Sequence, residues 1–135
     1  MVVRTYEDLN AWRLSDDLKN GVYAILAATH AKRDGKFCDQ IRASSSSAPA
    51  NIAEGFGYFD HPQFAKHVRI AIASLDETRN HLGDGIDRRF WTLRQIEPLL
   101  LLQRRARGAA VGLLRYLTSS NAPKPWATPD PTASD

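Results

Sequence analysis

The sequence predicts an all-α protein, an antiparallel up-down-up-down four-helix bundle, and three observations support this fold class. Apolar residues recur at every third or fourth position in four separate segments, which is the spacing of amphipathic helices. No segment shows the strict alternation of a half-buried strand. The segments are similar in length and have short connections, which favours antiparallel neighbours. We expect one domain, residues 1–118, with helices over about 6–30, 36–57, 61–88 and 92–118.

The first helix is predicted from a capping signal followed by apolar periodicity. Thr5 and Asp8 have the spacing of a capping box. Apolar side chains then follow at Leu9, Trp12, Leu18, Val22, Ile25 and Leu26. The polar stretch AKRDGK after this segment is short enough to reverse the chain direction.

The second helix contains the stretch QIRASSSSAPANIAEG, whose serines could belong to a flexible linker. A linker lacks periodic apolar residues, whereas this segment keeps helical spacing at Phe37, Ile41, Ala48 and Ile52. We therefore interpret the serines as a narrow helix face that lets a neighbouring backbone approach closely. Pro49 lacks an amide hydrogen and crowds the Ser45 carbonyl, so we expect a kinked continuous helix. The alternative is a helix that stops near Ala48 and restarts at Pro49.

Capping signals delimit the last two helices. Gly55 and Gly57 end the second helix, and Asp60-His61-Pro62-Gln63 provides an N-cap, an early proline and a capping-box residue. Thr92 and Gln95 have capping-box spacing before the fourth helix, which Pro98 should bend or delay. The tail, residues 119–135, has four prolines and little apolar content, so we expect it to be extended or disordered.

Composition indicates a cytoplasmic protein without a membrane anchor. The chain has 135 residues, of which 43% are hydrophobic, enough to bury a core. Its single cysteine, Cys38, cannot form an internal disulfide and is expected to be a small core residue. The first residues, MVVRTYEDLNAW, show no secretion signal. No run approaches the roughly 20 apolar residues of a membrane span.

Catalytic and metal-binding motifs are not found in the sequence, which predicts a protein that is not an enzyme and needs no cofactor. A di-iron bundle requires Glu-x-x-His pairs, and none of the glutamates is followed by histidine at that distance. His81, Asp84 and Asp87 share a rough helix face, which is more typical of a polar surface than of a metal site. The sequence also has no nucleophile elbow, phosphate-binding loop or dinucleotide-binding turn.

Three sequence elements together resemble a known family. They are QIR at Gln40 to Arg42, NIAEG at Asn51 to Gly55, and FAKHVRIAIASLDE at residues 64–77 after an aromatic-rich turn. The combination resembles the 23S rRNA intervening-sequence proteins, whose superfamily includes the accessory variability determinant proteins of diversity-generating retroelements. The resemblance covers about residues 6–117. Where the family commonly has a basic residue after QIR, and Gly-Ser in the third segment, this chain has Ala43 and Ala73-Ser74.

The resemblance implies a four-helix bundle that forms a ring-like homopentamer without enzyme activity. By analogy with the retroelement relatives, it also implies binding to nucleic acid and to a protein partner such as a reverse transcriptase.

The NIAEG motif also has a direct physical interpretation. Asn51 and Glu54 are three residues apart beside Gly55, so both polar groups can face one neighbouring helix or subunit. If they are buried, they need partners such as Arg42. The alternative is a solvated Glu54 near the helix end.

Basic residues are concentrated in the last helix and the turn before it. Residues 1–60 carry seven Lys/Arg against eight Asp/Glu, whereas residues 88–118 carry seven arginines against Glu97 alone. At roughly 100° per residue, several arginines share the helix face opposite the apolar one. These are Arg94, Arg104, Arg105 and Arg115, with Gly108 and Gly112 between them. Planar guanidinium groups and exposed backbone suit phosphates.

A second group of cations is predicted at one end of the bundle. The connections after the first and third helices share an end in this topology, which brings together Lys32, Arg33, Lys36, Arg88, Arg89 and Arg94. Asp34 and Asp87 offset part of this charge. Phe90 and Trp91 lie at the same end, and aromatic rings beside cations suit single-stranded nucleic acid. The alternatives are solvated or subunit-paired arginines, and a Trp91 that closes the bundle end.

We therefore expect a non-enzymatic, homo-oligomeric bundle that binds RNA or DNA as an accessory or scaffold. The alternative function is a protein–protein assembly module without affinity for nucleic acid, in which the same arginines form salt bridges between subunits. Oligomerisation has sequence support of its own, because Ile96, Leu100 and Leu114 widen the apolar face of the fourth helix beyond one stripe. The pentameric state is implied by the resemblance alone.

Overall fold

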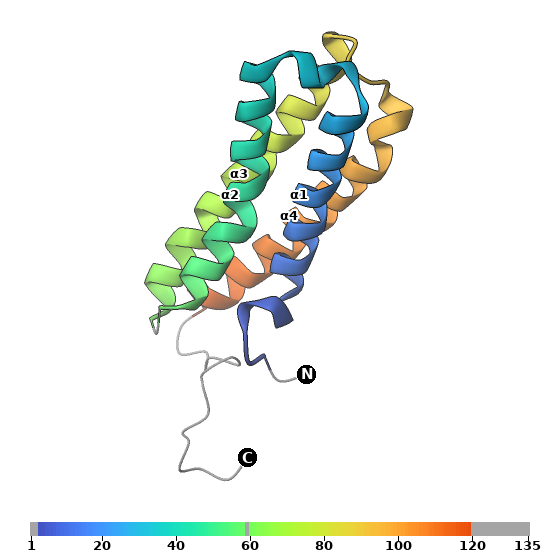
Figure 1. Ribbon diagram of the computed structural model, residues 1–135. Coiled ribbons are helices and arrows are strands. Elements are labelled where there is room, and N and C mark those ends of the chain that lie inside the picture. Colours follow the sequence, from blue (N-terminus) through green and yellow to red (C-terminus); the bar gives the residue numbers. More distant parts are fainter. Residues whose placement is uncertain (1–2, 59, 120–135) are drawn as a thin grey trace.

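The computed structural model describes residues 3–58 and 60–119, and this part of the chain folds into an antiparallel bundle of four α-helices (Figure 1). The helices are α1 (Asn10–Ala28), α2 (Gly35–Phe56), α3 (His61–Asp87) and α4 (Leu93–Thr118). Two 3-10 helices, η1 (Tyr6–Asp8) and η2 (His30–Arg33), precede α1 and α2. The described residues contain no strand. The predicted all-α four-helix bundle is confirmed.

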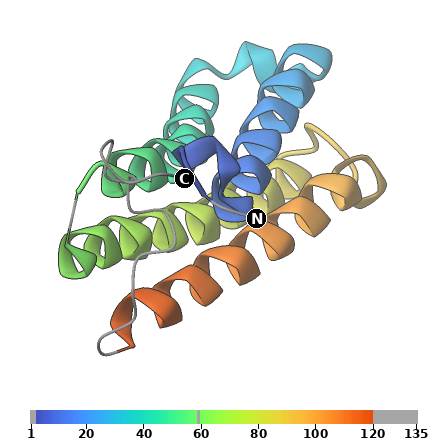
Figure 2. The ribbon, with the colours of Figure 1, turned by 90° about the horizontal axis from the view of Figure 1, so that it is seen from below.

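The helices pack in a ring, and each one contacts its neighbours in sequence. Helix α1 packs on α2 and α4, and α3 also packs on α2 and α4. Figure 2 shows the pair α1–α2 on one side of the molecule and the pair α3–α4 on the other. The α1–α2 and α3–α4 connections therefore lie at the same end, at the top of Figure 1.

The segment predicted as one helix over residues 6–30 is divided. The short η1 ends at Asp8, whose carboxylate accepts hydrogen bonds from the backbone amides of Arg4 (2.8 Å) and Thr5 (3.0 Å). These two hydrogen bonds lower the pKa of Asp8. Leu9 then has an extended backbone, with φ −78° and ψ 127°, and α1 begins at Asn10. The predicted capping signal therefore belongs to a separate turn before α1.

The serine run is helical, and α2 continues through Pro49. The alternative of a helix that stops near Ala48 is therefore wrong. The hydroxyl groups of Ser44, Ser45 and Ser46 donate to carbonyls three residues earlier in the same helix. These local hydrogen bonds let small polar side chains face a neighbouring helix without leaving a donor unpaired.

Short polar contacts join this narrow face of α2 to α3. Ser74 Oγ donates to Ser47 Oγ at 2.8 Å, and Thr78 Oγ1 lies within hydrogen-bonding distance of Ser44 Oγ, at 3.0 Å. Thr78 also bonds the Ser74 carbonyl in its own helix. Because hydroxyl groups on both helices meet directly, α2 and α3 pack closely along the serine run.

Helix α4 begins at Leu93 and is continuous through Pro98, so the proline does not delay its start. The capping box is present: the Gln95 amide donates to Thr92 Oγ1 (3.3 Å), and the Thr92 amide donates to Gln95 Oε1 (2.8 Å). The tail prediction concerns residues 119–135, which lie outside the described part of the chain except for Ser119.

The apolar residues that widen the predicted face of α4 are packed within the monomer. Ile96 is fully buried, and Leu100 and Leu114 are half-buried against the core. They therefore give less support to oligomerisation than the sequence suggested. The large apolar side chains that α4 exposes are Leu93 and Leu101. Within the described ranges, no helix has the length and hydrophobicity to cross a bilayer.

Candidate nucleic-acid interface

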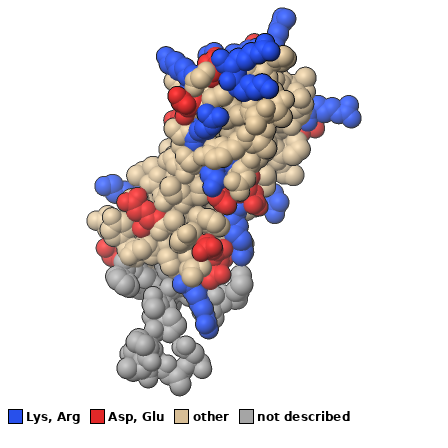
Figure 3. Space-filling view, viewed as in Figure 1, with Lys and Arg blue, Asp and Glu red and all other residues tan. Residues whose placement is uncertain are grey.

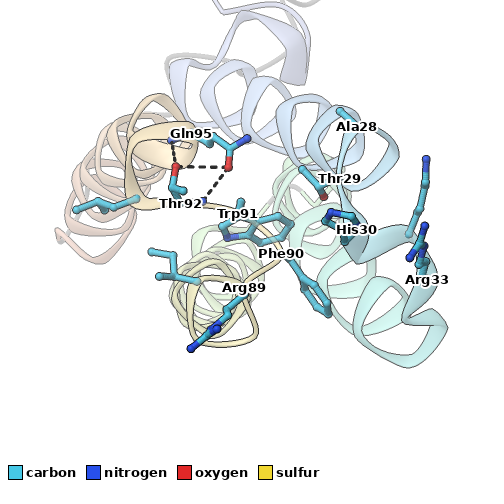
Figure 4. A pocket seen from close by; sticks show the side chains of 12 residues that line it. Ala28, Thr29, His30, Arg33, Arg89, Phe90, Trp91, Thr92 and Gln95 are labelled. Atoms are coloured by element: carbon cyan, nitrogen blue, oxygen red, sulfur yellow. Dashed lines mark hydrogen bonds between the residues drawn. The ribbon is translucent and has the colours of Figure 1, made fainter.

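Lysine and arginine side chains gather at the end of the bundle formed by η2 and the α3–α4 turn, at the top of Figure 3. We call this region the basic end. Between the two connections lies an open cavity of about 680 Å³, which Figure 4 shows from close by. Its lining comprises Ala28, Thr29, His30, Lys32, Arg33, Ile86, Arg89, Phe90, Trp91, Thr92, Leu93 and Gln95.

The α3–α4 turn has a defined backbone geometry that positions Arg89 and Phe90. The Phe90 amide donates to the Gly85 carbonyl, and the Arg89 amide donates to the Ile86 carbonyl, both at 2.9 Å. This pair of bonds is a Schellman motif, which places one residue in the left-handed region. That residue is Arg89, with φ 62°, where glycine is the usual choice. Arg89 is the one described non-glycine residue with positive φ.

Trp91 closes the bundle end beneath the cavity. The residue is only 3% exposed, and its indole Nε1 donates to the Leu82 carbonyl at 2.9 Å. The indole lies so close to Gly85 that a Cβ atom there would overlap it. The prediction that Trp91 offers a stacking surface therefore needs correction, because its rings are covered by the core. Phe90, which is half-buried, is the more accessible aromatic residue of this turn.

Arg88 connects the two halves of the basic end and is engaged within the monomer. Its Nε donates to Asp84 Oδ2 at 2.8 Å, and its Nη1 donates to Asp34 Oδ2 at 3.3 Å. The hydrogen bond and charge of Asp84 raise the pKa of Arg88. The guanidinium also lies over the Phe37 ring, 5.5 Å from its centroid. Arg88 therefore has a structural role, unlike the other predicted cations.

Three cations line the cavity without a carboxylate beside them. Lys32, Arg33 and Arg89 are exposed and form no ion pair within the described residues. No aspartate or glutamate is among the lining residues. Lys36 and Arg94 are also exposed at the basic end, outside the cavity lining. The cavity lining thus combines three cations with apolar side chains.

The four predicted arginines of α4 all lie on its exposed face. We call Arg94, Arg104, Arg105 and Arg115 the α4 strip. None of them forms an ion pair with a described residue, whereas the neighbouring Arg107 pairs with Asp76 of α3 at 2.8 Å. A Cβ atom at Gly108 or Gly112 would meet no atom within 4 Å, so the backbone between the arginines is open. The exposed Leu101 lies on the same face.

Some motif residues of α2 pack against α3, and others are exposed to solvent. Asn51 bridges the helices: its Nδ2 donates to the Ser47 carbonyl (2.9 Å), and its Oδ1 lies 3.1 Å from His67 Nδ1. A Cβ atom at Gly55 would lie 2.8 Å from the His67 Cβ atom, so α3 approaches the backbone there. Glu54 is 62% exposed on its side chain, with an oxygen 3.9 Å from His67 Nδ1.

The remaining motif residues do not form the predicted partnership with Glu54. Arg42 lies 3.8 Å from Asp39 of its own helix, and Gln40 is exposed. Arg42 is therefore not the partner of these polar groups, and the exposed Glu54 agrees with the alternative of a solvated side chain near the helix end. The partner of Asn51 and Glu54 is His67, which the sequence pattern did not single out.

The cavity also contains polar residues that the sequence analysis missed, namely Thr29, His30 and Gln95. His30 directly precedes Ala31-Lys32-Arg33, so its position beside basic residues could have indicated that it belongs to this site. Within residues 3–58 and 60–119, no three His, Cys, Asp or Glu side chains are arranged to hold a metal ion. The chemistry of this end is therefore that of cations, hydroxyl and amide groups around an apolar floor.

Comparison with protein families identifies a match over most of the chain. A family model described as 23S rRNA-intervening sequence protein matches residues 7–107. No curated protein matches the chain. The match includes all of α1, α2 and α3 and more than half of α4.

Proposed function

The chain belongs to the 23S rRNA-intervening sequence protein family, and from this premise we propose that it is a non-enzymatic, homo-oligomeric scaffold that binds RNA or DNA. The basic end and the α4 strip are the proposed contact surfaces. This proposal extends beyond the family assignment, and it depends on the charges of the described residues.

The observation that carries the proposal is a set of exposed cations without internal partners. In the described chain, Lys32, Arg33, Lys36, Arg89 and the α4 strip form no ion pair. Other basic side chains, such as Arg88 and Arg107, are paired with aspartates. Phosphate groups supply the missing negative charge, and planar guanidinium groups bind them through paired hydrogen bonds.

The first test is a titration of labelled single-stranded RNA and DNA at two salt concentrations. Binding through phosphates releases counterions, so log K should fall by roughly 0.7 per phosphate contact for each tenfold rise in salt. If no binding is detected at the lower salt concentration, the proposal is wrong.

Two charge-reversal double variants distinguish the effect of the α4 strip on binding from the effect of net charge. Arg104→Glu with Arg105→Glu should abolish binding and leave helicity unchanged, because both side chains are exposed. Lys66→Glu with Arg69→Glu on α3 is the matched control, since it changes the net charge equally at two other exposed positions without ion pairs in the described chain. Equal loss in both variants would show that net charge, and not the strip, determines binding.

A second candidate function is a protein–protein assembly module, and one observation favours it. Leu93 and Leu101 are 53% and 49% exposed on α4, among the arginines of the strip. Apolar side chains between cations suit a protein surface as well as a nucleic acid. Light scattering measures the oligomeric mass, for which we propose a homopentamer from the family resemblance. If the Arg104→Glu, Arg105→Glu variant loses assembly instead of RNA binding, the assembly module is favoured.

A further inference from the structure

We propose that the cavity at the basic end binds one nucleotide, with the base against the apolar floor and the phosphate at the cationic rim. This proposal rests on the proposed function where the nucleotide is the end of an RNA or DNA strand. A free mononucleotide has the same chemistry, so the experiment below distinguishes the two sources.

The cavity has a suitable size and two chemically distinct parts. Its volume of about 680 Å³ is within the roughly 300–1,000 Å³ of typical small-molecule sites. The half-buried Ile86 and Phe90 supply the apolar floor, with the buried Trp91 beneath it, and Figure 4 shows Phe90 between Arg89 on one side and Arg33 on the other. A ligand that fills this cavity needs an apolar flat part and an anionic group within one molecule.

The rim favours an anion because three cations border the cavity and no acidic residue is part of its lining. Lys32 and Arg33 approach from η2, and Arg89 approaches from the α3–α4 turn. Thr92, the N-cap of α4, and Leu93, its first residue, line the same cavity, so the positive end of the helix dipole lies beside it. His30 adds a ring nitrogen that can donate a hydrogen bond.

The backbone conformation of Arg89 is consistent with a use for its side chain at the cavity. A left-handed conformation at this position costs an arginine free energy that glycine would avoid. Strained residues of this kind concentrate at functional sites, where the side chain has a use that compensates for the strain. The Arg89 guanidinium forms no ion pair with a described residue and lies at the cavity.

A simpler explanation of the cations at the rim is that they compensate for the dipoles of α1 and α3 at their C-termini. This explanation accounts for the cations only in part. Cations stabilise helix C-termini when they lie in the last turn. The last turns of α1 and α3 contain no basic residue, because Lys32, Arg33 and Arg89 lie beyond both helix ends. A cation that only compensated for the α3 dipole would also not require the strained Arg89 position.

The experiment measures binding of a nucleoside 5′-monophosphate, the matching nucleoside and inorganic phosphate to the full chain by calorimetry. We expect the monophosphate to bind more tightly than either part alone, because both cavity regions are then occupied. Arg89→Gly should weaken monophosphate binding by at least about tenfold, the loss expected for one charge-assisted hydrogen bond. Because glycine suits the turn, this variant keeps the fold.

Two further variants make the result specific to the cavity. Ala28→Trp places a large side chain at an exposed lining position and should block binding of the monophosphate. Arg69→Ala removes an exposed arginine near the start of α3, away from the cavity, and should leave monophosphate affinity unchanged. Equal weakening by Arg89→Gly and Arg69→Ala would overturn the proposal, as would inorganic phosphate that binds as tightly as the monophosphate.

A parallel RNA titration separates this proposal from the general one. If RNA binds, the monophosphate does not, and Arg89→Gly leaves RNA affinity unchanged, the cavity proposal fails and the proposed function stands. If the monophosphate binds and RNA does not, the cavity is a free-nucleotide site and the proposed function fails. If neither binds, both proposals fail.

Discussion

Ser74 Oγ of α3 donates a hydrogen bond of 2.8 Å to Ser47 Oγ of α2, so the two helices meet through their smallest polar side chains. The contact lies between the Ser44–Thr78 pair and the Asn51–His67 pair, which continue it along the same interface. A stretch of sequence with the composition of a linker therefore forms direct polar contacts with the neighbouring helix.

Enlarging the buried face of the serine run should destabilise the bundle. Ser44→Leu adds a branched side chain at a position that is 3% exposed, against Thr78. Overpacking of this kind costs roughly 1–3 kcal/mol. Ala43→Leu, at the preceding exposed position, should change the free energy of unfolding by less than about 0.5 kcal/mol. Urea denaturation measures both, and equal stability of the two variants would mean that the serine face is not tightly packed.

Two glycines in helices should respond to alanine in opposite directions. At Gly55, a Cβ atom would lie 2.7 Å from the Phe64 ring, so Gly55→Ala should lower the free energy of unfolding by roughly 1–3 kcal/mol. At Gly108 the space is open, so Gly108→Ala should raise it by roughly 0.5–1 kcal/mol because alanine loses less backbone entropy. Thermal unfolding of the two variants tests the pair, and a stabilising Gly55→Ala would contradict the close approach of α3.

Adjacent arginines in the α3–α4 turn should also have opposite effects on stability. Arg89→Gly should stabilise the protein by about 1 kcal/mol, because φ 62° is unfavourable for arginine. Arg88→Ala should destabilise it, because the contacts to Asp84, Asp34 and Phe37 are lost. Arg89→Ala keeps the backbone strain and should have little effect. Chemical denaturation of the three variants would reject the assignment of strain if Arg89→Ala and Arg89→Gly were equally stable.

The single thiol should react slowly in the folded protein. Cys38 is 2% exposed, its Sγ lies 3.1 Å from the Ala31 carbonyl oxygen, and burial raises the pKa of the thiol. A raised pKa reduces the thiolate fraction at pH 8, and the thiolate is the reactive form. A colourimetric thiol reagent should therefore label the native protein much more slowly than the protein in urea. Equal rates would show that the segment around Cys38 opens readily.

The bundle could be predicted from the sequence because apolar periodicity and caps are local signals. Thr92 and Gln95 form the predicted capping box, and Ile41, Ala48 and Ile52 are buried as their spacing indicated. The division of the first helix at Leu9 was not predicted, because helical spacing continues across that residue.

The details of the candidate site depend on contacts between distant segments, which sequence spacing does not specify. Arg88 and Asp34 are 54 positions apart, so their pairing gave no local signal. The residues next to Trp91 in the sequence do not indicate whether it lies on the surface or in the core. Its contacts with the Leu82 carbonyl and Gly85 place it in the core. The role of His67 as partner of Asn51 depends in the same way on the register between α2 and α3.

The start of α1 and the end of α4 lie at the end of the bundle opposite the basic end (Figure 1). A biosensor surface or a fluorescent fusion attached beside either of these points would leave the basic end exposed to the solution. Ligand binding at the basic end should therefore be measurable on immobilised protein, because the attachment does not cover that end.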